Sequence, residues 1–215
     1  MIVLNLAIKI AAAILSVPPE AISVCLPPMA PPPRSAQEFQ RRRDIDAALA
    51  SVWKDTDGFD SPSDEQELVD GRHGVTTEAT SKRPSTYGEV TTLGSRQLFD
   101  YMHMYPPAFD LNKRKEEDKF VFYDLGSGAG RLVTQSFLEL RSIHKAVGVE
   151  MATSRHMAAK NAWQKLLDSG RADDIRRMGE EDNSRNVIEA AKCVHFYEGD
   201  LFDLDVSDAT HIYAA

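Results

Sequence analysis

Cysteine is scarce in this 215-residue chain, which contains only Cys25 and Cys193. The two lie far apart, and neither belongs to a CxxC pair or a Cys/His cluster, so we expect no disulfide framework and no metal site. Basic charge is also in short supply, because 25 Lys and Arg residues face 33 Asp and Glu residues, for a net charge of −8. This balance argues against a surface that holds nucleic acid by broad phosphate neutralisation.

The chain also lacks an apolar run long enough to predict a stable membrane span. Residues 1–17 are almost wholly apolar, but Asn5 and Lys9 interrupt them and Pro18 follows. A spanning helix needs about 20 apolar residues. Three interpretations stay open: a secretory or organelle-targeting signal without the usual basic beginning, an unstructured leader, and a start codon placed upstream of the true one.

Composition divides the chain into three regions. Residues 1–34 join the apolar leader to a proline-rich linker, which we expect to be extended. Residues 35–84 begin with a helix predicted over 36–53, because Ser35 and Glu38 have the spacing of a capping box and the apolar residues after them share one helical face. The rest of this region is polar without a period, as in a surface loop or a disordered segment.

The third region, residues 85–215, alternates helices and strands. We expect helices over 92–104, 129–141 and 153–167, and strands over 119–124, 146–150, 193–197 and 210–214. A polar, charged stretch over 168–186 and a short helix near 187–191 precede the third strand. This order predicts an α/β fold with a doubly wound parallel sheet that binds ligands beyond the carboxyl ends of its strands. Because the chain ends within an apolar strand, we expect the sheet to be incomplete.

A glycine-rich loop at the end of the first strand is the strongest motif. Asp124 ends the strand and is followed by the loop glycines and a serine, which are Gly126, Ser127, Gly128 and Gly130. Glycines permit a tight turn and a close approach of the backbone to a ligand, although a purely structural turn is the alternative. Glu150 ends the next strand about 20 residues beyond the loop, where a carboxylate can accept hydrogen bonds from ribose hydroxyls.

Spacing and charge indicate which nucleotide-like ligand this motif suits. The glycines follow GxGxG rather than GxGxxG, and Asp124 would repel a pyrophosphate. S-adenosylmethionine (SAM) has no phosphate and carries an ammonium and a sulfonium, so it fits an acidic pocket better. A dinucleotide-dependent oxidoreductase is the second candidate, and a simple cap of the loop is the structural alternative for Asp124.

A second acidic segment follows the third strand. Asp200 is placed to accept the adenine amino group, and Leu201 or Phe202 to cover the ring. An acidic turn with buried apolar neighbours is the alternative.

With Tyr87-Gly88-Glu89 upstream, these motifs resemble the class I SAM-dependent methyltransferases called disruptor of telomeric silencing-like, or Dot-one type, which are non-SET histone lysine methyltransferases. The resemblance covers roughly residues 86–215. It implies a Rossmann-like fold in which Tyr87 and Glu89 close over the cofactor on the catalytic side, next to Thr91. It also implies that the segment 124–130 holds the methionine end of SAM, Glu150 the ribose, and Asp200 with Leu201 the adenine.

The chain departs from that family at three positions: Val90 replaces a threonine, Arg131 a glutamine, and Leu201 an aromatic residue. The asparagine-containing strand end that lines the lysine channel in the family would follow Ala215. The resemblance implies methyl transfer from SAM to a lysine of a histone or nucleosome in the nucleus.

Two alternatives to this activity remain. One is a class I methyltransferase acting on another substrate, such as a different protein, in an organelle or the secretory route. The other is a SAM-binding fragment without catalysis. The candidate basic contacts to a nucleosome are Arg41-Arg42-Arg43 and Lys113-Arg114-Lys115, although such short runs are more often solvated faces.

Overall fold

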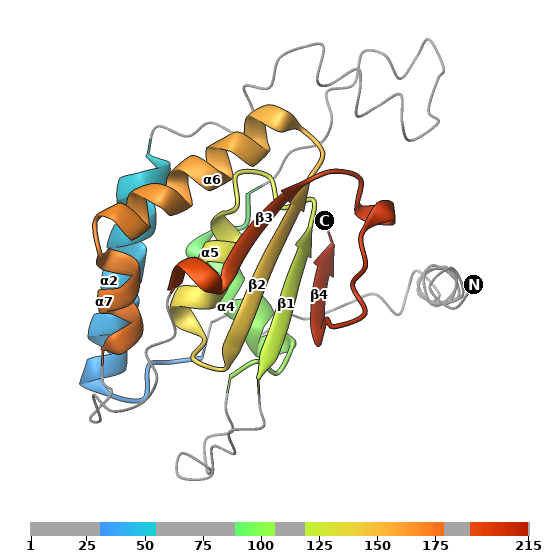
Figure 1. The fold of residues 1–215 in the computed structure, drawn as a ribbon. Helices are drawn as coiled ribbons and strands as arrows, with labels where there is room; N and C mark the ends of the chain where they lie inside the picture. The colour runs from blue at the N-terminus through green and yellow to red at the C-terminus, as the bar shows by residue number, and fades with distance from the viewer. Residues whose placement is uncertain (1–30, 55–88, 106–118, 179–189, 215) are drawn as a thin grey trace, which may run out of the picture.

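A parallel four-stranded sheet, in the order β3-β2-β1-β4, forms the centre of the computed structural model (Figure 1). The structure describes residues 31–54, 89–105, 119–178 and 190–214. The strands are β1 (Phe120–Leu125), β2 (Ile143–Glu150), β3 (Val194–Glu198) and β4 (His211–Ala214), and each neighbouring pair is parallel. The predicted α/β class and parallel sheet are therefore confirmed.

The direction of strand addition reverses beside β1. The chain adds β2 and β3 outward on one side of β1, and then returns to place β4 on the other side. In sheets of this kind the crevice at the reversal, beyond the carboxyl ends of the strands, is the usual ligand site. The strand order alone therefore predicts a ligand site at the carboxyl ends of β1 and β4.

The α-helices of the described segments gather on one side of the sheet (Figure 1). They are α2 (Ala36–Trp53), α4 (Thr92–Tyr101), α5 (Arg131–Glu139), α6 (Thr153–Asp168) and α7 (Arg171–Arg177). Their apolar side chains share one core with this face of the sheet, and Phe99, Phe122 and Phe137 are among its fully buried members. The opposite face carries a smaller cluster around Tyr123 and Val147, which Leu201, Leu204 and Val206 cover.

Helix α2 has the bounds that the sequence predicts. Ser35 is its N-cap and accepts a hydrogen bond from the Glu38 amide at 3.0 Å, which is the predicted capping interaction. Ile45, Leu49 and Trp53 are buried in the same core as the helices that follow the glycine loop. The helix is therefore packed into the sheet domain.

The polar, charged stretch over 168–186 contains a helix that the sequence did not predict. Residues Arg171–Arg177 form α7, which buries Ala172 and Ile175. Arg176 is buried with them and donates hydrogen bonds of 2.7–2.9 Å to the carbonyls of Phe137, Leu140, Arg141 and Ile143. The Arg176 guanidinium thus satisfies backbone carbonyls inside the core, because its five N–H donors can bond several carbonyls at once.

Other bounds shift by a few residues. Helix α4 ends at Tyr101 rather than 104, because His103 adopts a left-handed φ of 56°. Strand β2 begins at Ile143 rather than 146, and α5 begins at Arg131 because Gly130 before it is left-handed. Short 3-10 helices η2 (Ala190–Lys192) and η3 (Leu201–Asp203) flank β3; of the short helix predicted near 187–191, the residues before Ala190 lie outside the described residues.

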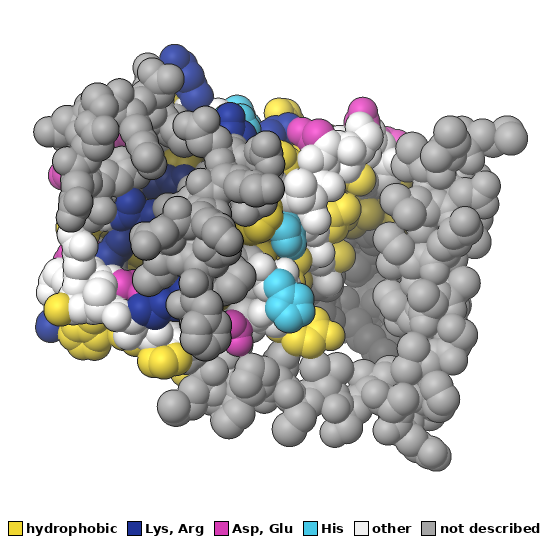
Figure 2. All heavy atoms as spheres, turned by 90° about the horizontal axis from the view of Figure 1, so that it is seen from below, with side chains coloured by type: hydrophobic (Ala, Val, Ile, Leu, Met, Phe, Trp, Pro, Cys, Tyr) yellow, Lys and Arg dark blue, Asp and Glu magenta, His cyan; other side chains and the backbone are white. Residues whose placement is uncertain are grey.

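Within the described ranges, no helix has the length and apolar character needed to cross a membrane. The predicted apolar leader, the linker before residue 31 and the polar loop over 55–84 lie outside these ranges. Among the described side chains on the face seen in Figure 2, basic ones lie beside acidic and hydrophobic ones.

Candidate functional site

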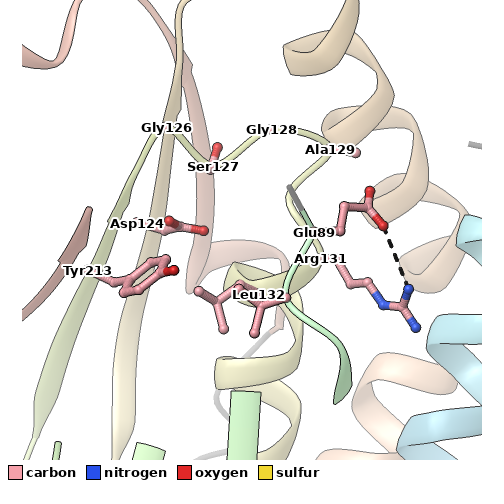
Figure 3. Close-up of a pocket in the computed structure, with 10 residues that line it drawn as sticks. Glu89, Asp124, Gly126, Ser127, Gly128, Ala129, Arg131, Leu132 and Tyr213 are labelled. Carbon is pink, nitrogen blue, oxygen red and sulfur yellow. Dashed lines mark ion pairs between the residues drawn. The ribbon is translucent and has the colours of Figure 1, made fainter. Parts of the chain in front are cut away.

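A pocket lies at the reversal of strand order, beneath the glycine loop (Figure 3). It holds about 370 Å³ of space, part of which is open solvent. Its lining comes from the segment before α4, the end of β1, the loop, the start of α5 and the end of β4: Glu89, Val90, Asp124, Gly126, Ser127, Gly128, Ala129, Arg131, Leu132 and Tyr213. The structure therefore brings Glu89, Asp124 and most of the loop together, as the sequence predicts.

Asp124 supplies the buried charge of this pocket. Its side chain extends from β1 into the space that Tyr213 and Leu132 also face (Figure 3), and the residue is only 3% exposed. Burial, with a further contribution from the negative charge of Glu150, raises the pKa of Asp124 to about 7. A buried carboxyl group with a raised pKa at a pocket wall is suited to meet a cation, which would stabilise its ionised form.

The first part of the glycine loop is bonded to the end of β2. The amides of Gly126 and Ser127 both donate to the Val149 carbonyl, each at 2.9 Å. The Gly128 amide donates to Oε2 of Glu150 at 2.8 Å. These amides are therefore engaged within the protein.

The last amide of the loop is engaged as well, because Gly130 donates to the Ser127 carbonyl at 2.9 Å. A phosphate site at a helix N-terminus depends on backbone N–H groups that point at the anion. With four loop amides already used, this loop is poorly suited to a pyrophosphate. It agrees better with a ligand that brings no phosphate.

Glu150 braces the loop as well as ending β2. Besides the bond from Gly128, its Oε1 accepts the Ala152 amide at 2.9 Å, and the residue is buried. Each carboxylate oxygen has a second lone pair, so both retain capacity to accept from a ligand. Glu150 does not line the pocket itself.

Gly126 and Gly130 have different surroundings although both are left-handed, with φ of 87° and 78°. Among the described residues, no atom outside the immediate neighbours lies within 4 Å of the position that a Cβ would take at Gly126, on the pocket wall. At Gly130 a Cβ would lie 2.5 Å from the ring of Phe196 and 2.7 Å from Ala159. Gly130 is outside the pocket lining. The close approach of Phe196 in β3 and Ala159 in α6 explains why a glycine is needed at this position.

Ser127 presents a polar atom without an internal partner. Its Oγ is buried, and no hydrogen-bond partner for it exists among the described residues. Buried hydroxyls in folded proteins are nearly always hydrogen bonded. Ser127 lines the pocket, but its Oγ lies against β2, 2.7 Å from the position that a Cβ would take at Gly148.

The upstream motif is described from Glu89 onward, and Tyr87 lies outside the described residues. Glu89 lines the pocket and forms an ion pair with Arg131, 3.7 Å between Oε2 and Nη1 (Figure 3). The Thr91 side chain caps α4 by accepting the Gly94 amide at 3.0 Å, and Thr91 is not among the lining residues.

The predicted adenine segment lies near the site but outside the pocket. Gly199 donates to the Glu150 carbonyl at 3.0 Å, which places this segment at the end of β2. Asp200 caps η3 by accepting the Phe202 amide at 3.0 Å, while Leu201 packs on the cluster around Tyr123. Phe202 is 72% exposed, so its ring is accessible at this edge.

Sequence reasoning missed several residues around the pocket. Tyr213 and Leu132 line it, and the rule that ligands bind beyond strand ends would have indicated Tyr213. Trp53 was also missed: its indole Nε1 donates to the Ala129 carbonyl at 2.8 Å. No local signal indicates this contact, because 76 residues separate the two.

The basic run at residues 41–43 is largely internal, which corrects its interpretation as a nucleosome contact or a solvated face. Arg41 and Arg42 are both buried. Arg41 donates to the carbonyls of Leu138 and Ile175, and Arg42 pairs with Glu38. Only Arg43 is exposed. The second run, residues 113–115, lies outside the described residues.

No three His, Cys, Asp or Glu side chains are grouped as metal ligands in the segments that the structure describes.

Residues 80–169 match the sequence model of the protein family described as histone methylation protein DOT1. This range contains the glycine loop and Glu150, and the match confirms the resemblance to Dot-one-type methyltransferases. No curated protein sequence matches the chain significantly.

Proposed function

We propose that this chain is a SAM-dependent protein lysine methyltransferase of the Dot-one type that modifies a core histone in nucleosomes, in the nucleus. One observation carries the SAM part: a buried carboxylate, Asp124, and a glycine loop with four engaged amides enclose the same pocket. This combination favours a cationic ligand without phosphate. The histone part rests on the family match over residues 80–169.

The proposal assigns each end of the cofactor to residues of this chain. Asp124 would hold the ammonium, Ser127 would lie beside it in the loop, and the open space at Gly126 would admit the methionine end. Glu150 would accept the ribose hydroxyls through its remaining lone pairs. Asp200 and Leu201 at the edge of β2 would meet the adenine.

SAM, when bound, supplies an electrophilic methyl group. The protein then has to align a lysine amine with that group and exclude water, since methyl transfer is an in-line displacement. Tyr87, Glu89 and Thr91 would close this side of the pocket, and Glu89 already lies at its wall beside Arg131. An apolar channel would favour the neutral, nucleophilic form of the lysine.

A second candidate is a class I methyltransferase with an acceptor other than the nucleosome, such as a different protein. The burial of Arg41 and Arg42 favours it, because it removes one of the two predicted basic runs from the surface. The net charge of −8 points the same way.

A calorimetric titration of SAM, with a dinucleotide as the comparison ligand, tests the cofactor. We expect saturable SAM binding to the full chain, and a dissociation constant raised roughly tenfold to a hundredfold by Glu150→Gln, because a charged acceptor is lost. Glu198→Gln is the matched control, since Glu198 ends β3 in register with Glu150 but is exposed. A preference for the dinucleotide would overturn the proposal.

Labelled SAM then tests the acceptor. The proposal expects methyl transfer to nucleosomes in preference to free histones. Transfer only to other proteins would favour the second candidate, and SAM binding without any transfer would indicate a non-catalytic SAM-binding chain.

A further inference from the structure

Helix α2 ends against the glycine loop. Its last residue, Trp53, is 5% exposed and donates its indole N–H to the Ala129 carbonyl at 2.8 Å. Ala129 is itself buried and lines the pocket. A residue outside the family match of 80–169 thus contacts the backbone of the ligand loop directly.

Two hydrogen bonds hold the peptide group that joins Ala129 to Gly130: its carbonyl accepts from Trp53, and its amide donates to the Ser127 carbonyl. The preceding part of the loop is fixed by bonds to β2, through Val149 and Glu150. Ala129 instead lies between Gly128 and Gly130, which are both left-handed. Glycine restricts the backbone less than any other residue, so the orientation of the peptide groups around Ala129 is weakly determined by local sterics.

Trp53 can fix this orientation because α2 is itself held firmly. Arg41 donates to the carbonyls of Leu138 and Ile175, and Asp46 pairs with Arg96 of α4 at 2.7 Å. Ile45 and Leu49 are fully buried in the shared core. The indole N–H is therefore presented from a rigid support.

We propose that Trp53 is a positioning residue for the cofactor, which holds the Ala129 side of the loop in the geometry that receives the methionine end of SAM. The inference rests on the proposed SAM function and adds α2 to the parts of the chain that build the site. A charge-neutral hydrogen bond of this kind contributes a modest but measurable amount to the order of the loop.

Trp163 provides a matched control. It is also 5% exposed and packs edge to face on Phe137, at 5.8 Å between ring centroids. Its Nε1 has no hydrogen-bond partner among the described residues. Trp163→Phe therefore removes a buried indole without removing a hydrogen bond, whereas Trp53→Phe removes both.

The first measurement compares SAM with 5′-methylthioadenosine, which lacks the amino-acid end, by calorimetry on the full chain and both variants. We expect Trp53→Phe to raise the dissociation constant of SAM about fivefold to tenfold and to change that of 5′-methylthioadenosine less than twofold. Trp163→Phe should leave both unchanged. Equal losses for the two ligands, or unchanged SAM binding in Trp53→Phe, would overturn the inference.

The second measurement is amide hydrogen exchange of residues 126–131 without ligand. Exchange should be faster in Trp53→Phe than in the unmodified chain and Trp163→Phe. If the unmodified chain binds no SAM, the proposed function fails, while this exchange comparison still decides whether Trp53 orders the loop.

If Trp53→Phe does not fold, the two indole N–H signals of the unmodified chain serve instead. The Trp53 signal should exchange slowly and shift when SAM is added, and rapid exchange of that signal would contradict the inference.

Discussion

Gly130 packs directly on Phe196, so that a Cβ at Gly130 would lie 2.5 Å from the Phe196 ring. The Cβ of Ala159 in α6 would lie 2.7 Å from the same point. Gly130 thus joins the start of α5 to β3 and α6 at a distance that a side chain forbids. The last glycine of the loop is required by the packing of the fold, whatever ligand the pocket holds.

Gly130→Ala should therefore destabilise the protein more than a change that strains the backbone alone. Gly170 is the matched comparison, because its φ of 72° is similar and no non-neighbouring atom in the part of the chain that the structure describes lies within 4 Å of its Cβ position. We expect Gly170→Ala to cost about 1 kcal/mol and Gly130→Ala about 1–3 kcal/mol more, measured by urea unfolding. Equal losses would show that the contact with Phe196 relaxes freely.

Gly126→Ala separates ligand binding from stability. Its backbone strain should resemble that of Gly170→Ala, since φ is 87° and the Cβ position is open. The added methyl group would, however, stand on the pocket wall. We expect SAM affinity to fall at least tenfold in Gly126→Ala and to stay unchanged in Gly170→Ala; calorimetry at a temperature where both variants are folded checks this.

Glu139 joins three helices in the core. Its buried carboxylate, on α5, accepts from Arg96 of α4 at 2.8 Å and from the Tyr105 hydroxyl at 2.8 Å, and lies 3.5 Å from Arg42 of α2. Glu139→Gln removes the negative charge that faces the buried guanidinium groups of Arg42 and Arg96. We expect the free energy of unfolding to fall by about 3 kcal/mol.

Asp203→Asn is the control for Glu139→Gln, because it removes the same charge from an exposed position in η3. Its effect should stay within about 0.5 kcal/mol. Thermal unfolding of both variants makes the comparison, and similar midpoints would contradict the role assigned to the Glu139 cluster.

The sequence predicts best those features that depend on neighbouring residues. The bounds of α2 follow from the capping box at Ser35 and an apolar face of helical period. Asp124, Gly126 and Gly128 meet in one pocket because they belong to a single strand-to-helix turn. Local rules suffice for these elements, since all of their determinants are close in the chain.

Features that depend on tertiary contacts were missed. Arg41 belongs to a run predicted as basic surface, and Arg176 to a stretch predicted only as polar and charged, yet both are buried donors to backbone carbonyls at the ends of other elements. Composition cannot reveal this role, because it is the free carbonyls of distant segments that make such a position favourable. The contact of Trp53 with Ala129 has the same origin.

Asp124 should make the stability of the protein depend on pH. Its pKa in the folded protein is about 7, against an ordinary value of 3.8. Between about pH 4 and pH 7 the folded state therefore holds a proton that the unfolded state has released, so stability falls as the pH rises through this range. Asp124→Asn has no such proton to lose, and it should be more stable than the unmodified chain at pH 8.

We expect this gain in the free energy of unfolding at pH 8 to be at least about 2 kcal/mol, and the difference between the two proteins to shrink toward pH 4.

SAM binding should respond to pH in the opposite sense, because the ligand ammonium needs the ionised carboxylate. The affinity of the unmodified chain should rise from pH 6 to pH 8, while Asp124→Asn should bind weakly at both. Thermal unfolding and calorimetry at each pH measure the two effects. A variant that is less stable than the unmodified chain at pH 8 would show that Asp124 is an internal structural charge; a variant that is more stable but fails to bind SAM would identify it as a carboxylate kept buried for its ligand.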